Sequence, residues 1–210
     1  DEEAEEYDQN AFEVFRKGET IGVFQFESPP MQKYLKELQP QTMGDICFMA
    51  AAYRPGPMQY IPDYIAIRNG RKQAEYIIPE LEPILKATLG FPVYQEQLLQ
   101  IAMKLGGFSL GEGDVIRNAL KKKQLDILKQ KEGDFKEYFV KNYDYGEDIA
   151  SEIWKQLEPF ASYGFNKAHA SSYAAVAYWC AFLKGNYPLE FMTALMHADL
   201  ENTERVVIDM

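Results

Sequence analysis

A group of hydrogen-bond donors in residues 163–174, YGFNKAHASSYA, is the stretch of this sequence best suited to chemistry. Asn166, Lys167 and His169 follow a Gly-Phe pair and precede an apolar run. This pattern predicts that they stand at the start of a helix, where backbone N–H groups and the helix dipole favour an anion. A lone histidine in such a place is also consistent with a simple cap, so both interpretations stay open at this point.

A second group of cations lies between residues 117 and 131, which hold six Lys or Arg against one acid, Asp126. Arg117 and Lys121 are spaced i, i+4 and so share a helix face, which Lys122 and Lys123 extend. Cations spread in this way suit a ligand with several negative charges, such as a triphosphate. The alternatives are a solvated helix face or lysines that complement a helix C-terminus.

Arg54 is a further candidate, because the segment YRPGPM is a rigid turn that could aim its guanidinium. The alternative for Arg54 is an ordinary surface turn.

Other classes of chemistry find no support. Cys180 and His169 would stand about 16 Å apart along one helix, too far for a catalytic dyad. The sequence lacks the nucleophile elbow, the phosphate-binding loop and the dinucleotide fingerprint. It also lacks Asp-x-Asp, and its two cysteines and two histidines do not form a zinc pattern. We therefore predict no catalytic residue and no metal site.

Composition sets further bounds. The 210 residues are 47% apolar, enough for a real core, and carry a net charge of −10. That charge counts against a nucleic-acid binder, although residues 1–8 alone supply six carboxylates. The absence of a long apolar run and the acidic, Met-free start predict a cytoplasmic protein without a membrane span or signal peptide, and we expect a piece of a longer protein. Cys47 and Cys180 are expected to be free thiols.

The dominant period is helical. The spacing predicts helices over 94–105, 109–123, 148–160, 171–184 and 187–200. Ser109 and Glu112 have the spacing of a capping box, Pro159 is expected to close the third helix, and Pro188 suits a helix start. The nearly apolar segment 171–184 suggests a buried helix. The best strand candidate is 19–28, so we predict an all-α chain with at most one short β-hairpin there, folded as one helical domain.

Six motifs in order are familiar: GETIGVFQFES, AAYRPGPM, VYQEQLLQIA, GGFSLGEGDVIRNALKKK, YGFNKAHASSYA and YPLEFMTALM. They resemble the alpha subunit of bacterial DNA polymerase III, the C-family of replicative DNA polymerases, from about Tyr7 to the end. The resemblance implies the fingers domain over 19–210, preceded by an acidic lead-in from the palm over 1–18. It also implies part of a DNA-directed DNA polymerase, a nucleotidyltransferase whose catalytic aspartates and Mg²⁺ lie in the palm, so this piece alone is expected to be inactive.

The same resemblance implies that the fingers position the incoming deoxynucleoside triphosphate. The matching nucleotide-binding residues are Arg117, Lys122, Lys123, Asn166, Lys167 and His169. Arg54 and Lys121 are left as DNA contacts or structural residues. The implied partners are primer-template DNA, deoxynucleoside triphosphates, the other polymerase domains and replisome subunits, with no membrane.

Three positions depart from the family's motifs. Asn118 replaces a second arginine, Lys121 replaces a glycine, and Pro30 replaces a glycine in the loop after Glu27. Asn118 removes a positive charge, and Lys121 restores one three positions later. Pro30 stiffens its loop. They bear on triphosphate binding more than on the fold.

Two alternatives from other classes remain. The cluster Lys121–Lys131 could grip the DNA backbone without a nucleotide role, which would make DNA affinity steeply salt-dependent. An exposed apolar patch, for example in the aromatic segment Tyr138–Tyr145, could instead contact other replisome subunits.

Overall fold

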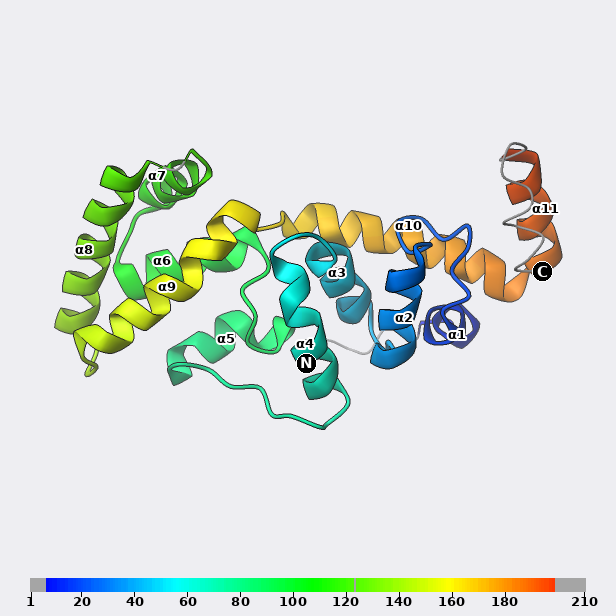
Figure 1. Ribbon diagram of the computed structural model, residues 1–210, viewed down its shortest axis with the longest axis horizontal. Helices are drawn as coiled ribbons and strands as arrows, with labels where there is room; N and C mark the ends of the chain where they lie inside the picture. Colours follow the sequence, from blue (N-terminus) through cyan, green and yellow to red (C-terminus); the bar gives the residue numbers. More distant parts are fainter. Residues whose placement is uncertain (1–6, 123, 199–210) are drawn as a thin grey trace. The chain divides into compact units, whose positions relative to one another are not determined.

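The structure is a computed structural model that describes residues 7–122 and 124–198 (Figure 1). In these residues the backbone is helical or irregular and forms no strand or sheet. Tyr94 and Phe165 make a single isolated parallel β-bridge. The all-α prediction is therefore confirmed.

The segment 19–28, the best strand candidate of the sequence, is a run of turns and forms no hairpin. The Val23 N–H donates to the Thr20 carbonyl and the Phe26 N–H to the Val23 carbonyl, each at 3.0 Å. Gly22 takes a left-handed φ of 80°, which helps to reverse the chain. Val23 and Phe26 are both fully buried although three positions apart. A strand would bury alternate residues, whereas successive turns bring these two to the same side.

The described chain forms two compact units. The first comprises Asp1–Tyr53 and Ala168–Met210, and the second comprises Arg54–Lys167. The boundary between Lys167 and Ala168 falls in the first turn of helix α10 (Lys167–Asn186). The sequence-based boundary between 1–18 and 19–210 stays a prediction.

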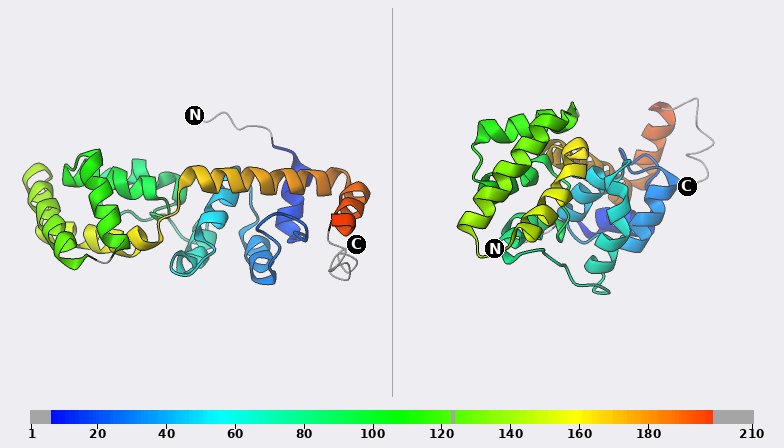
Figure 2. Two further views of the ribbon diagram at one scale, coloured as in Figure 1. Left: turned by 90° about the horizontal axis from the view of Figure 1, so that it is seen from above. Right: turned by 60° about the vertical axis from the view of Figure 1, so that its left-hand side comes forward.

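The first unit is built around α10. It also contains α1 (Gln9–Lys17), α2 (Pro29–Leu38), α3 (Met43–Ala52) and α11 (Pro188–Ala198). Figure 2 shows α10 as one continuous helix with α1, α2 and α3 along one side. The Tyr178 ring of α10 lies 6.1 Å from the Phe12 ring of α1, and the Asn186 amide donates to the Asp8 carboxylate at 3.0 Å.

Helix α10 separates its residues by size. Its fully buried positions are small, namely Ala170, Ala174, Ala177 and Ala181. Val176, Trp179 and Leu183 are 37%, 63% and 47% exposed. The expectation of a buried helix was therefore wrong for this face, because the alanines occupy the packed side and turn the large side chains outward.

The second unit packs four long helices. These are α6 (Gln95–Gly106), α7 (Leu110–Lys121), α8 (Leu125–Asn142) and α9 (Glu147–Tyr163). Short elements precede them, namely η1 (Pro57–Tyr60), α4 (Ile61–Arg68), η2 (Pro79–Leu81), α5 (Glu82–Leu85) and η3 (Lys86–Thr88). Aromatic rings fill much of the core: Phe135 stacks on Phe139 with centroids 6.1 Å apart and lies 5.5 Å from Trp154.

Most of the helix ends that the sequence predicted are found in the structure. The Glu112 N–H donates to Ser109 Oγ at 3.3 Å and the Ser109 N–H to Glu112 Oε2 at 3.0 Å, which confirms the capping box. Pro188 opens α11 as predicted. The prediction that Pro159 ends its helix was wrong, because α9 runs on to Tyr163. A proline removes one backbone donor but does not prevent later residues from staying helical.

No helix within the two described ranges has both the length and the apolar character needed to cross a membrane.

Candidate anion-binding site

The start of α10 is joined to the start of α6 in the second unit. The Phe165 N–H donates to the Val93 carbonyl at 3.0 Å, and the Gln95 N–H donates to the Phe165 carbonyl at 2.9 Å. These two bonds form the isolated bridge between Tyr94 and Phe165. They fix the backbone immediately before the predicted donors.

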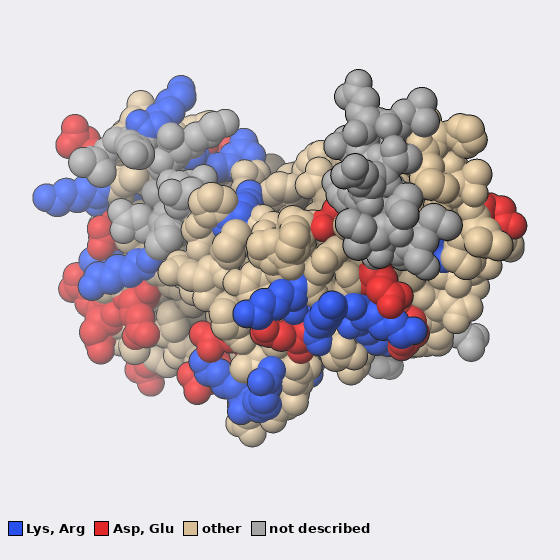
Figure 3. All heavy atoms as spheres, turned by 45° about the vertical axis from the view of Figure 1, so that its right-hand side comes forward, with Lys and Arg blue, Asp and Glu red and all other residues tan. Residues whose placement is uncertain are grey.

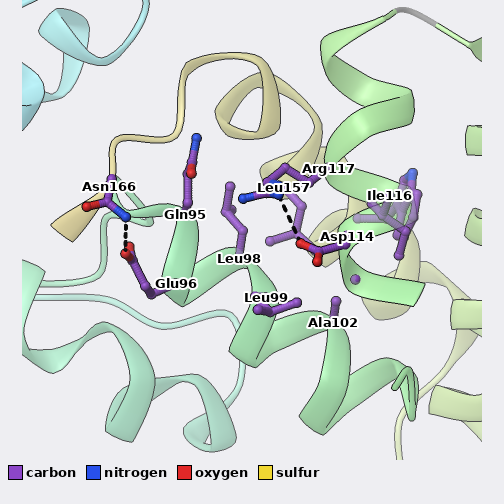
Figure 4. Close-up of a pocket in the computed structure, with 12 residues that line it drawn as sticks. Gln95, Glu96, Leu98, Leu99, Ala102, Asp114, Ile116, Arg117, Leu157 and Asn166 are labelled. Atoms are coloured by element: carbon purple, nitrogen blue, oxygen red, sulfur yellow. Dashed lines mark hydrogen bonds and ion pairs between the residues drawn. The ribbon is translucent and has the colours of Figure 1, made fainter. Parts of the chain in front are cut away.

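A carboxylate from α6 occupies this helix start. Glu96 Oε1 accepts from the Asn166 amide at 3.0 Å and from the Lys167 backbone N–H at 3.1 Å (Figure 4). Glu96 Oε2 accepts from the same N–H at 3.0 Å. The anion that the sequence led us to expect at this place is therefore, in the chain itself, the side chain of Glu96. Asn166 and Lys167 are both exposed.

Arg54 lies against the same segment. Its guanidinium carbon is 4.5 Å from the centroid of the Phe165 ring. Arg54 is partly buried, and this desolvation lowers the pKa of its guanidinium. The stacking favours the structural interpretation of Arg54, since it packs the ring that carries the backbone bridge.

Arg117 stands on α7 and forms an ion pair with Asp114, with Nη2 and Oδ1 3.1 Å apart. The two side chains are 50% and 52% exposed, so this pair is weak and exchangeable. Lys122, just past the end of α7, is exposed. Lys123 and the side chain of Lys121 lie outside what the structure describes.

A cavity of about 120 Å³ brings two of the predicted residues together, because Arg117 and Asn166 both line it (Figure 4). It lies between α6, α7 and α9 and is lined by Gln95, Glu96, Leu98, Leu99, Ala102, Gly113, Asp114, Ile116, Arg117, Trp154, Leu157 and Asn166. Gly113 allows the helices to approach, since a Cβ there would lie 2.0 Å from Leu99 Cδ1. No pattern in the sequence indicated this cavity.

His169 belongs to the first unit. Its ring centroid is 4.0 Å from that of Tyr173, whose ring in turn packs edge-on against Phe24 at 5.0 Å. His169 itself is exposed. The unit boundary separates it from Asn166 and Lys167, although the three residues share one sequence motif.

The basic segment 117–131 is partly neutralised within the chain. Lys131 Nζ lies 3.0 Å from Glu112 Oε1, 3.2 Å from Asp134 Oδ2 and 5.1 Å from the centroid of the Phe108 ring. A backbone hydrogen bond from Ser109, reinforced by the hydrogen bond from Lys131, lowers the pKa of Glu112 to about 2. On the face shown in Figure 3, basic side chains stand beside acidic ones in several places.

Two residues of this site were not singled out from the sequence. Glu96 and Asp114 hold three of the predicted donors, Asn166, Lys167 and Arg117. Asp114 is three positions from its partner, a spacing that could have suggested the pair. Glu96 is 70 positions from Asn166, and no local pattern could have revealed that contact.

Comparison with known proteins identifies the family. Residues 2–143 match the family model of the bacterial DNA polymerase III alpha subunit finger domain. The chain is 47% identical over 206 residues to the DNA polymerase III subunit alpha of Halalkalibacterium halodurans, an alignment that covers 97% of this chain and 18% of that protein. The proteins of the same name from Borreliella burgdorferi and Chlamydia trachomatis are 42% and 44% identical, with 95% of this chain and 17% and 16% of the relatives covered.

The chain thus spans less than a fifth of the length of these relatives, at an identity above 40% throughout. The family model alone covers more than half of the sequence. The chain therefore belongs to the finger-domain family of the bacterial DNA polymerase III alpha subunit.

Proposed function

We propose that this chain is the fingers part of a cytoplasmic bacterial replicative DNA polymerase and positions the incoming deoxynucleoside triphosphate for template-directed synthesis. Family membership supports the polymerase assignment. The observation that carries the nucleotide role is the juxtaposition of Arg117, on α7, and Asn166, in the segment just before α10, which line one cavity. Primer-template DNA, the other polymerase domains and replisome subunits are the partners in this proposal.

The proposed roles follow from charge and hydrogen bonding. Arg117, Lys122, Lys123 and Lys167 would contact phosphate oxygens, while Asn166 and His169 would donate hydrogen bonds. Separate cations suit a triphosphate because its charge is spread over several oxygens. Arg117 can exchange its exposed partner Asp114 for a phosphate at little cost. Such contacts position the nucleotide and stabilise its charge during the reaction.

Within the described part of the chain, no three His, Cys, Asp or Glu side chains gather where they could hold a metal ion. As the family resemblance implies, the proposal places Mg²⁺ and the catalytic carboxylates in the palm, outside this chain. The chain is left with binding and positioning, and we expect it to be inactive alone.

The test is single-nucleotide incorporation by the complete alpha subunit that carries this sequence. Arg117→Ala and Lys167→Gln are each expected to raise the KM for the nucleotide at least about tenfold, since a hydrogen bond to a charged group contributes about 1.5–3 kcal/mol. Arg71→Ala and Lys155→Gln remove exposed cations from the same unit and should leave KM unchanged. An unchanged KM in both Arg117→Ala and Lys167→Gln would contradict the nucleotide role.

The DNA-gripping alternative is weakened by the pairing of Lys131 with two carboxylates. Lys122 and Lys129 remain exposed and could still contact phosphates. The salt dependence of DNA affinity distinguishes this alternative from the nucleotide role. If Lys129→Gln reduces the salt slope of primer-template affinity by about 1 while the nucleotide KM stays constant, the segment grips DNA.

A protein-contact role is favoured by one observation, the exposed apolar face of α10. Val176, Trp179 and Leu183 recur on one side of that helix and are all exposed. In the segment Tyr138–Tyr145, Tyr138 and Val140 are also exposed, whereas Phe139 is buried and stacks on Tyr143. This second candidate predicts that Trp179→Gln impairs assembly with other subunits and leaves nucleotide incorporation by the alpha subunit intact.

A further inference from the structure

Glu96 supplies a negative charge where a nucleotide phosphate was expected. Its carboxylate accepts from the Asn166 amide and the Lys167 N–H at 3.0 and 3.1 Å through one oxygen, and from the same N–H at 3.0 Å through the other. We propose that Glu96 is a positioning residue: it closes the backbone start of α10 and orients Asn166 and Lys167 so that their side chains meet the nucleotide. This inference rests on the proposed function.

The first turn of α6 holds Glu96 in a fixed place. The neighbouring residue Gln97 is buried, accepts from the Tyr94 N–H at 3.0 Å and donates to Thr88 Oγ1 at 2.7 Å. The backbone bridge to Phe165 secures the same turn on its other side. Glu96 is itself partly buried. A carboxylate presented by such a turn has little freedom to leave its donors.

Electrostatics explain why an acid stands here. The first N–H groups of a helix lack intrahelical partners, and the dipole makes this end positive. Glu96 satisfies the Lys167 N–H from outside α10. A phosphate would therefore find this donor already engaged. The nucleotide is then recognised by the Lys167 ammonium and the Asn166 side chain, not by the backbone of the helix start.

Two effects of Glu96 on nucleotide affinity have opposite signs, and two variants separate them. The negative charge repels a triphosphate, whereas the hydrogen bonds orient its ligands. Glu96→Gln removes the charge and keeps a side-chain acceptor of nearly the same shape. Glu96→Ala removes both. We expect KM at or below the wild-type value for Glu96→Gln, and KM about tenfold higher for Glu96→Ala, with kcat changed less than threefold in both.

The experiment uses the complete alpha subunit that carries this sequence. Steady-state incorporation gives KM and kcat, and hydrogen exchange of a peptide covering residues 163–170 reports the backbone N–H groups of this turn, that of Lys167 among them. Exchange should accelerate in Glu96→Ala and stay slow in Glu96→Gln. Glu147→Ala is the matched control, since Glu147 is an exposed first-turn glutamate of α9 in the same unit.

Each result decides the matter. If Glu96→Ala and Glu96→Gln change KM equally, or if kcat falls tenfold while KM is constant, Glu96 does not act by positioning and the inference is overturned. If Lys167→Gln raises KM while Glu96→Ala does not, the proposed function stands and the inference alone fails. If neither Lys167→Gln nor Glu96→Ala changes KM, the inference fails, and the proposed function fails with it when Arg117→Ala also leaves KM unchanged.

Discussion

The stack of Arg54 on Phe165 allows a sharp test of whether Arg54 is structural. The guanidinium carbon is 4.5 Å from the ring centroid, and the arginine is partly buried. A cation–π contact contributes about 0.5–1 kcal/mol at an exposed site and about 2 kcal/mol when desolvated. For this intermediate burial we expect a coupling free energy of about 1 kcal/mol between the two side chains.

A double-mutant cycle with Arg54→Met and Phe165→Leu measures that coupling, because both variants keep apolar bulk. The chain has two tryptophans, Trp154 in the second unit and Trp179 in the first. In a Trp179→Phe background, urea unfolding followed by fluorescence therefore reports the unit that contains the stack. The control pair Arg71→Met and Phe165→Leu should be additive within about 0.5 kcal/mol, since Arg71 is exposed.

A coupling below about 0.3 kcal/mol would refute the structural reasoning, because it would mean that the ring does not stabilise the cation. The DNA-contact interpretation makes a different prediction for Arg54→Met. Removing one phosphate contact should lower the salt slope of DNA affinity by about 1 without any change in the unfolding midpoint.

Three further predictions concern stability. The pKa of Glu112 is lowered from 4.5 to about 2, so the ionised carboxylate stabilises the fold above about pH 4.5, and this stabilisation is lost as the pH falls toward 2. Glu112→Gln should therefore reduce the drop in the urea unfolding midpoint between pH 4.5 and 2. An unchanged drop would count against the capping network. Gly107 has a φ of +67°, and a Cβ there would lie 2.3 Å from the Tyr138 ring, so Gly107→Ala should cost at least about 1 kcal/mol in urea unfolding. Gly133→Ala is its control, because that helical site is open and should gain about 0.5–1 kcal/mol. Ala177→Leu overpacks the buried side of α10 and should lower the unfolding free energy by about 1–3 kcal/mol, whereas a neutral result would show that this side is loosely packed.

Signals carried within a few residues predicted much of this fold. The 3.6-residue period placed α6, whose buried face includes Ile101 and Leu105. The capping box of Ser109 and Glu112 and the proline at the start of α11 are likewise local. These features could be predicted because the partners of each group lie within one helical turn. The order of the motifs also sufficed to indicate the family.

Local signals failed where burial depends on distant partners. The apolar residues of 19–28 are compatible with a strand as well as with turns. Only in the folded chain do successive turns bring Val23 and Phe26 to one side. The apolar composition of α10 likewise does not reveal which face is covered, and its alanines turned out to occupy the packed side.

The candidate site shows the same division. The sequence alone determined which residues carry donors and cations, since these are properties of the side chains, and it placed Asn166 and Lys167 at a helix start. Only the tertiary structure decided that Glu96 holds that start, that Phe165 lies beneath Arg54, and that Arg117 and Asn166 share a cavity. The physical reason is separation along the chain: Glu96 meets Asn166 across 70 positions, a contact that exists only once α6 and the segment before α10 have packed together.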